Sequence, residues 1–137
     1  TYDQDNVFAR IIRGEIPCHR VYEDADTLAF MDLMPQAEGH TLVVPKAAGE
    51  DVFATSPDAL AAAIRTAQMV ARAVKKAFAP PGIMIAQLNG AAAGQSVFHL
   101  HFHVIPRYAG KDLGIHAAKP ADHAVLAEHA ARIRAAL

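Results

Sequence analysis

The sequence lacks several features that define large classes of protein. It has one cysteine, Cys18, which excludes an internal disulfide and gives no metal-binding spacing. Its 13 Lys and Arg are balanced by 14 Asp and Glu, and the formal net charge is −1. No strong basic field is therefore present to hold a phosphate backbone. Nucleic-acid binding as the main function is not expected.

Long hydrophobic runs are also missing. The uncharged stretch at residues 86–100 is short for a bilayer span and is interrupted by Gln, Asn, Gly and Ser. The chain begins with acidic residues and no apolar stretch follows them, which is the wrong order for a secretory signal. We expect no membrane partner and a soluble, cytoplasmic protein.

What the chain does contain is enough apolar sequence for one core. It has 137 residues, of which 53% are hydrophobic and 20% are charged. This length and balance predict a single folded domain over residues 1–137. Short strands with helices inserted between them, rather than regular βαβ alternation, favour a mostly antiparallel α+β fold.

The local patterns predict five strands and three helices. Capping residues, prolines and apolar periodicity predict helices at 6–13, at 56–78 behind the start signal Ser56-Pro57-Asp58, and from about 121 onward. β-branched and aromatic residues predict strands at 20–22, 27–31, 40–44, 83–88 and 97–105.

The unusual feature is the histidine content, eight in all. Three of them, His99, His101 and His103, alternate within the last predicted strand. Because side chains on a strand alternate between faces, these three share one face, and the apolar residues between them share the other. We interpret the apolar face as core and the histidine face as the candidate site.

Two kinds of chemistry compete for this face. Residues four apart on a strand are about 13 Å apart, so His99 and His103 would struggle to meet at one zinc ion, although an adjacent pair with His40 could. A nucleophilic imidazole does not require several side chains to meet at one point. It requires only that its second nitrogen donate to a fixed acceptor, so that the bare nitrogen faces the substrate.

The sequence resembles the histidine triad family. The family signature, in which three histidines alternate with apolar residues and two apolar residues follow, stands here as His99-Leu100-His101-Phe102-His103-Val104-Ile105. Further matching blocks are residues 7–17, 29–32, 40–46 and 89–97, so the resemblance covers about residues 6–107. Residues 108–137 then form a C-terminal extension.

The resemblance implies an α+β, HIT-like fold with a five-stranded antiparallel sheet, two main helices and a C-terminal helix. It also implies a homodimer, a purine nucleotide pocket, and no cofactor. Family enzymes attack the α-phosphorus of nucleoside 5′-monophosphate derivatives and pass through a nucleotidyl-histidine intermediate. Carried over by position, His101 is the nucleophile, held by the main-chain carbonyl of His99. His103 donates to the phosphate, and His40 helps to orient the histidines.

The resemblance also implies a nucleotide-binding set. Ser96, Gln95 and the backbone at Gly94 would contact the phosphate or the leaving group, and Asn89 would support this region. Asp32 would bind the ribose hydroxyls, although by itself its position before a proline-containing loop is more typical of a turn residue. The apolar base slot would consist of Phe8, Ile11, Phe30 and Leu33.

Some family features are absent. Bacterial relatives that bind structural zinc carry a Cys-x-x-Cys pair where this chain has Asn6 and Ala9, so no metal is expected. The tryptophan-containing tail of the phosphoramidase branch is also missing. These absences leave the leaving group open, amine or nucleotide. The resemblance favours hydrolysis of purine nucleoside 5′-phosphoramidates or related nucleoside monophosphate derivatives. The alternatives are a dinucleoside polyphosphate hydrolase and a nucleotide-binding regulatory protein with vestigial catalysis. The remaining histidines, His19, His116, His123 and His129, are expected to be solvated.

Overall fold

The computed structural model describes residues 1–110 and 120–137. In chain order its elements are α1 (Val7–Ile12), β1 (Arg20–Glu23), β2 (Thr27–Met31), β3 (Thr41–Pro45), α2 (Pro57–Phe78), β4 (Gly82–Ala86), the 3₁₀ turn η1 (Ala91–Ala93), β5 (Phe102–Arg107) and α3 (His123–Ala136). The predicted α+β class is confirmed. No helix of the described residues is both long and apolar enough to cross a membrane.

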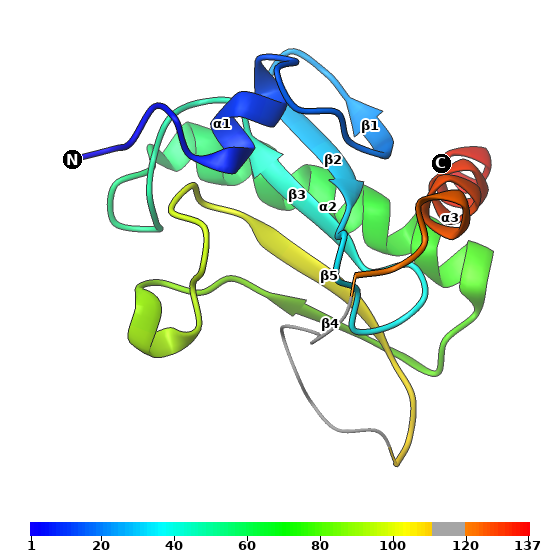
Figure 1. Ribbon diagram of the computed structural model, residues 1–137. Helices are drawn as coiled ribbons and strands as arrows, with labels where there is room; N and C mark the ends of the chain where they lie inside the picture. Colours follow the sequence, from blue (N-terminus) through cyan, green and yellow to red (C-terminus); the bar gives the residue numbers. More distant parts are fainter. Residues whose placement is uncertain (111–119) are drawn as a thin grey trace.

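The five strands form one antiparallel sheet in the order β1-β2-β3-β5-β4. Helices α2 and α3 cover one face, and α1 lies across the other (Figure 1). All five residues of strand β2 are buried, because both faces of the sheet are covered there. Ala29 and Met31 pack toward α2 and α3, while Leu28 and Phe30 pack toward α1. The period of two thus supplies two separate cores.

The long helix α2 begins and ends as its sequence predicts. The Ser56 side chain accepts a hydrogen bond from the Ala59 N–H, and Pro57 follows at the first helical position. The helix ends at Ala79, which adopts a left-handed conformation with φ of 48° before Pro80. A fully buried row of alanines and valines on α2 packs on the sheet, and Leu126 and Ile133 of α3 join the same core.

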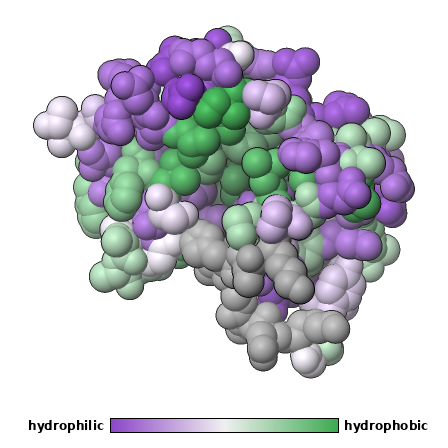
Figure 2. Space-filling model, viewed as in Figure 1, coloured by the Kyte–Doolittle hydropathy of each residue, from purple (hydrophilic) through white to green (hydrophobic). Residues whose placement is uncertain are grey.

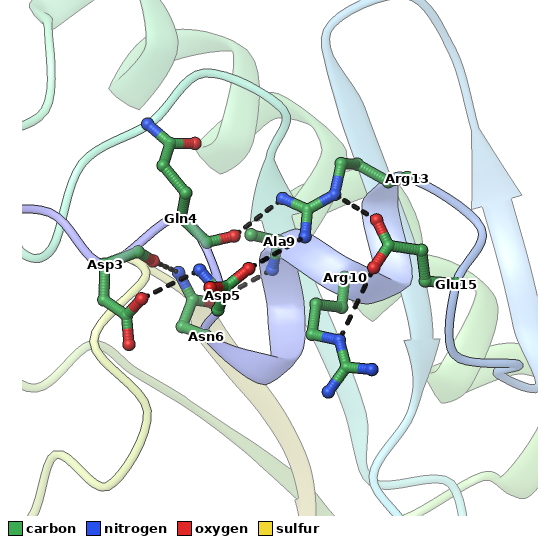
Figure 3. A network of polar contacts seen from close by, with 8 residues as sticks. All are labelled: Asp3, Gln4, Asp5, Asn6, Ala9, Arg10, Arg13 and Glu15. Carbon is green, nitrogen blue, oxygen red and sulfur yellow. Dashed lines mark hydrogen bonds and ion pairs between the residues drawn. The ribbon is translucent and has the colours of Figure 1, made fainter.

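Helix α1 is only six residues long, so its position depends on contacts other than its own helical hydrogen bonds. The Asn6 side chain caps it by accepting from the Ala9 N–H. Arg13 pairs with Asp5 and Glu15 and donates to the Gln4 carbonyl (Figure 3). These contacts tie the helix to the segments on either side of it.

The predicted strand at 97–105 is wrong in its first half. β5 begins at Phe102, which pairs with Val43. Continuing this register would place Leu100 opposite Pro45, and proline has no N–H to donate to a ladder. The Leu100 N–H instead donates to the Gly49 carbonyl, at 2.8 Å. His99 and His101 therefore precede the regular strand, and His103 lies within it.

The expectation of solvated histidines fails for His129. It is only 8% exposed, because it packs edge-on against the Phe78 ring between α2 and α3. His19 and His123 lie at the surface with their ring nitrogens 2.9 Å apart. His116 lies outside the described residues.

Candidate active site

One row of paired residues runs across the sheet on the face that α1 covers. Phe30 pairs with Leu42, and Leu42 pairs with His103. Since directly paired residues project to the same face, the imidazole of His103 belongs to the row that carries the apolar side chains under α1. Phe8 of α1 packs on Phe30 with ring centroids 5.4 Å apart.

A cavity of about 310 Å³ lies over this row. Figure 2 shows hydrophobic residues gathered on this face of the molecule, with hydrophilic residues around them. Most of the lining is apolar and includes the four residues expected to form a base slot: Phe8, Ile11, Phe30 and Leu33. Further apolar lining residues are Val7, Ile16, Pro17, Met31, Met34, Leu42 and Val97.

The cavity also has a small polar set, and all of it was predicted from the sequence. Asp32, Ser96, His101 and His103 line the cavity together with the apolar residues. Cys18 contributes a thiol, and burial raises the pKa of that thiol, which keeps it protonated and makes it a poor nucleophile. An apolar slot with few polar groups is the usual form of a small-molecule site.

His101 is held in one tautomer. Its Nδ1 lies 2.7 Å from the main-chain oxygen of His99. A carbonyl oxygen only accepts hydrogen bonds, so Nδ1 carries the proton and Nε2 of the neutral ring is bare. The Phe8 ring packs edge-on against the imidazole, with centroids 4.8 Å apart. The arrangement holds a potential nucleophile in a fixed orientation, as the resemblance implied.

His103 is held through His40. The Gln36 N–H donates to Nδ1 of His40 at 3.0 Å, which leaves the His40 proton on Nε2. Nε2 of His40 lies 3.1 Å from Nδ1 of His103 and donates its proton to it. His103 therefore accepts at Nδ1 and keeps its own proton on Nε2. A main-chain amide thus determines, through one buried histidine, that the second histidine is a donor.

His99 uses its side chain differently from the other two. Its Nε2–H donates to the Pro45 carbonyl at 2.7 Å, and its Nδ1 accepts from the Tyr2 hydroxyl at 2.6 Å. Burial lowers the pKa of this imidazole, while the bond to Pro45 acts in the opposite direction. The ring is 1% exposed and does not line the cavity. Only its carbonyl serves His101.

Asp32 lies in the cavity lining and also makes a turn contact. It lines the cavity, at the end of β2. One carboxylate oxygen accepts from the Met34 N–H at 2.8 Å, which is a turn contact, and the other lies 3.4 Å from Nε2 of His40.

The structure gives Gln95 a different position from the expected phosphate contact. Its Oε1 accepts from the Gly90 N–H, and its Nε2 donates to the carbonyls of Glu50 and Val97. Both amide protons are used, so the side chain cannot also donate to a phosphate without breaking a bond. Gln95 instead ties together the segments on either side of Ser96.

Asn89 and Gly94 also lie outside the cavity lining. Asn89 accepts from the Val52 N–H and exchanges bonds with the Gln87 amide. Gly94 has φ of 101°, a conformation that glycine adopts without strain. Both support the loop that leads to Ser96.

Among the described residues one group could in principle hold a metal ion, namely Asp32, His40 and His103. Its ligand atoms lie within 4.8 Å of one another. The hydrogen bond from Gln36 argues against coordination, because it leaves the proton on His40 Nε2, and a protonated nitrogen is not a ligand. At the positions of the family's cysteine pair, Asn6 caps α1 and Ala9 has no donor atom. The residues present fit a hydrogen-bond chain better than a metal site.

Comparison with known proteins identifies the family. A model of the HIT domain matches residues 13–110. The chain therefore belongs to the HIT, or histidine triad, family. It is 38% identical over 125 residues to adenylylsulfatase HINT3 of Arabidopsis thaliana. The aligned region covers 87% of this chain and 64% of that protein.

Solved structures confirm the expected fold. A HIT-like protein involved in cell-cycle regulation from Bartonella henselae matches with a TM-score of 0.93 and 49% identity, over 100% of both chains. A zinc-bound histidine triad protein from Mycobacterium smegmatis matches with a TM-score of 0.84 and 36% identity, over 97% of this chain and 93% of that one.

Sequence reasoning missed two contributors to the site. Tyr2 lies far from the histidines in sequence, and no motif or periodicity marks it. Gln36 acts through its main-chain N–H, which its side-chain type does not reveal. The Pro35-Gln36 turn before His40 was the available signal, because turns bring main-chain donors close to the residues that follow them.

The hydrogen bonds predict the tautomer of each site histidine. Nitrogen-15 NMR of the ring nitrogens, above the pH range in which these histidines titrate, should find the proton of His101 on Nδ1. It should find the protons of His40, His99 and His103 on Nε2. A proton on Nε2 of His101 would contradict the arrangement, because the nitrogen that faces the cavity would then be a donor.

Proposed function

We propose that the protein hydrolyses purine nucleoside 5′-phosphoramidates or related nucleoside monophosphate derivatives through a nucleotidyl-histidine intermediate. HIT-family proteins comprise nucleotide-binding hydrolases and transferases. The observation that carries the proposal is the bond from His101 Nδ1 to the His99 carbonyl, which places the ring proton on Nδ1 and leaves Nε2 unprotonated in a residue that lines the apolar cavity. No cofactor is needed for this chemistry.

In the first step, Nε2 of His101 attacks the α-phosphorus. A nitrogen–phosphorus bond forms, and the bond from phosphorus to the leaving group breaks as the leaving group takes a proton from solvent. The imidazole becomes cationic, and its Nδ1–H donates to the His99 carbonyl, which stabilises the positive charge. In the second step, water attacks the same phosphorus and gives a proton back to solvent. The nitrogen–phosphorus bond breaks, His101 returns to its neutral form, and the nucleoside monophosphate is released.

Two other lining residues would stabilise the charge that develops. His103 presents its Nε2–H as a donor to the phosphate oxygens, because His40 occupies its other nitrogen. Ser96 is exposed in the cavity wall, and its hydroxyl would donate to the phosphate or to the leaving group. The apolar slot would hold the purine, with Phe8 and Phe30 among its walls.

The leaving group divides the alternatives. Adenylylsulfatase HINT3 is named for an adenylyl group joined to sulfate, so the related chain supports α-phosphorus chemistry without selecting the amine. Dinucleoside polyphosphates and binding without turnover remain the rival proposals. Parallel assays with an adenosine phosphoramidate, adenylyl sulfate and a diadenosine polyphosphate test the choice. Fastest turnover of the phosphoramidate supports the proposal, and nucleotide binding without turnover of any of the three contradicts it.

The first kinetic prediction concerns the nucleophile. His101→Ala should fold and lose turnover entirely, because it removes the covalent route. His103→Ala should lose about 10²- to 10³-fold in kcat, the typical effect of deleting one charge-stabilising donor. Steady-state kinetics and circular dichroism on both variants test this. Equal losses for the two would mean that their roles are wrongly divided.

The second prediction concerns the sugar. Asp32→Ala should weaken ribonucleotide binding about ten- to a hundredfold and 2′-deoxyribonucleotide binding less, because the ribose offers a second hydroxyl to the carboxylate. Asp32→Asn is the control, since its side-chain oxygen can still accept from the Met34 N–H. Calorimetry on both sugars measures the effect. Equal losses for both would leave Asp32 with only its turn contact.

We also propose a homodimer through β4 and α2. β4 lies at one end of the strand order, and its Ile85 is 43% exposed, as is Ile64 on α2. These two residues and Ile83 line one shallow apolar hollow, and an edge strand offers backbone groups for pairing with another copy.

The dimer is tested by sedimentation at micromolar concentration. Wild type should have the mass of two chains, and Ile85→Arg should have the mass of one, because a buried unpaired charge opposes association. Val125→Arg, at an equally exposed position on α3, should remain dimeric. A monomeric wild type would refute the proposal.

A further inference from the structure

The segment that carries the proposed nucleophile is not held by the sheet. The ladder between β3 and β5 ends at the pair Val43 and Phe102, so His99 and His101 lie beyond it. Backbone position outside a ladder must come from other bonds. The Leu100 N–H donates to the Gly49 carbonyl, and the side chain of His99 adds two further hydrogen bonds to this turn.

The imidazole of His99 has no part in the chemistry proposed above, yet it is nearly fully buried. It is bonded at both nitrogens, to the Pro45 carbonyl and to the Tyr2 hydroxyl. Because a carbonyl can only accept, the bond to Pro45 fixes the proton on Nε2 and makes Nδ1 an acceptor. The Tyr2 hydroxyl is thus the donor that satisfies this nitrogen.

The geometry points to Tyr2 as a positioning residue for the nucleophile. Its hydroxyl fixes the ring of His99, and the fixed ring holds the His99 carbonyl in place to accept from Nδ1 of His101. Tyr2 does not line the cavity, so it acts only through His99. The catalytic consequence rests on the proposed function, whereas the arrangement of the ring nitrogens does not.

Nδ1 of His99 is a buried acceptor that the Tyr2 hydroxyl satisfies. Without the hydroxyl, Nδ1 would be unsatisfied, and the ring would rotate to find a partner. Rotation would disturb the bond to Pro45 and, with it, the main-chain turn between His99 and His101. The nucleophile would then spend part of its time misaligned, which lowers the rate without weakening substrate binding.

Tyr2→Phe tests this, because it removes one oxygen and keeps the ring that packs edge-on against His99. We expect kcat to fall about tenfold, the cost of one unsatisfied buried acceptor, with KM changed less than about twofold. Tyr22→Phe is the matched control. It removes a hydroxyl that donates to Asp24, away from the cavity, and should leave both constants unchanged.

Nitrogen-15 NMR separates positioning from loss of stability and needs no substrate. In wild type, His99 should carry its proton on Nε2, and its Nδ1 signal should be that of a hydrogen-bonded acceptor. In Tyr2→Phe the Nδ1 signal of His99 should shift to that of a nitrogen without this hydrogen bond, and the Nδ1 signal of His101 should shift as well. A merely destabilised protein would keep both signals. If wild type turns over no nucleotide, the proposed function fails, but these signals still decide the role of Tyr2.

A double-mutant cycle with His99→Ala completes the test. If Tyr2 acts through His99, then Tyr2→Phe should change kcat less than about twofold in that background. Unchanged kcat and an unchanged Nδ1 signal of His101 in Tyr2→Phe alone would overturn the inference, and so would equal losses with and without the His99 ring. Should His99→Ala fail to fold, the single variant and its ring-nitrogen signals decide the question.

Discussion

The hydrogen bond from Nδ1 of His101 to the His99 carbonyl is the constraint on which the site depends. An imidazole has two nitrogens, and only one of them can be the nucleophile at a time. The carbonyl oxygen of His99, 2.7 Å from Nδ1, can accept but not donate a hydrogen bond, so it fixes the ring proton on Nδ1. In the proposed mechanism, the same bond supports the cationic ring that forms when the other nitrogen bonds to phosphorus.

The surrounding structure supplies the positions that this bond requires. The sheet carries His103 in register with Leu42 and Phe30, so one donor lies on the same face as the apolar slot. The main-chain amide of Gln36 acts through His40 to keep that donor in the correct tautomer. The histidines of the triad thus have three different roles, although they alternate regularly in sequence.

Much of this was predictable from the sequence, and the exceptions have physical causes. Capping at Ser56 and the alternation in β2 are local signals, and both were interpreted correctly. The length of β5 was overestimated, because the interruption comes from Pro45 on a neighbouring strand, which periodicity within one strand cannot reveal. Gln95 was placed at the phosphate, but its amide is used by Gly90, Glu50 and Val97.

The most direct test of the account is chemical trapping of the intermediate. Wild-type protein mixed with excess adenosine phosphoramidate, quenched within one turnover and digested, should yield one peptide that carries a single adenylyl group, with fragmentation placing it on His101. An adduct on another residue, or substrate consumption without any adduct under conditions that slow the second step, would contradict the nucleotidyl-histidine mechanism.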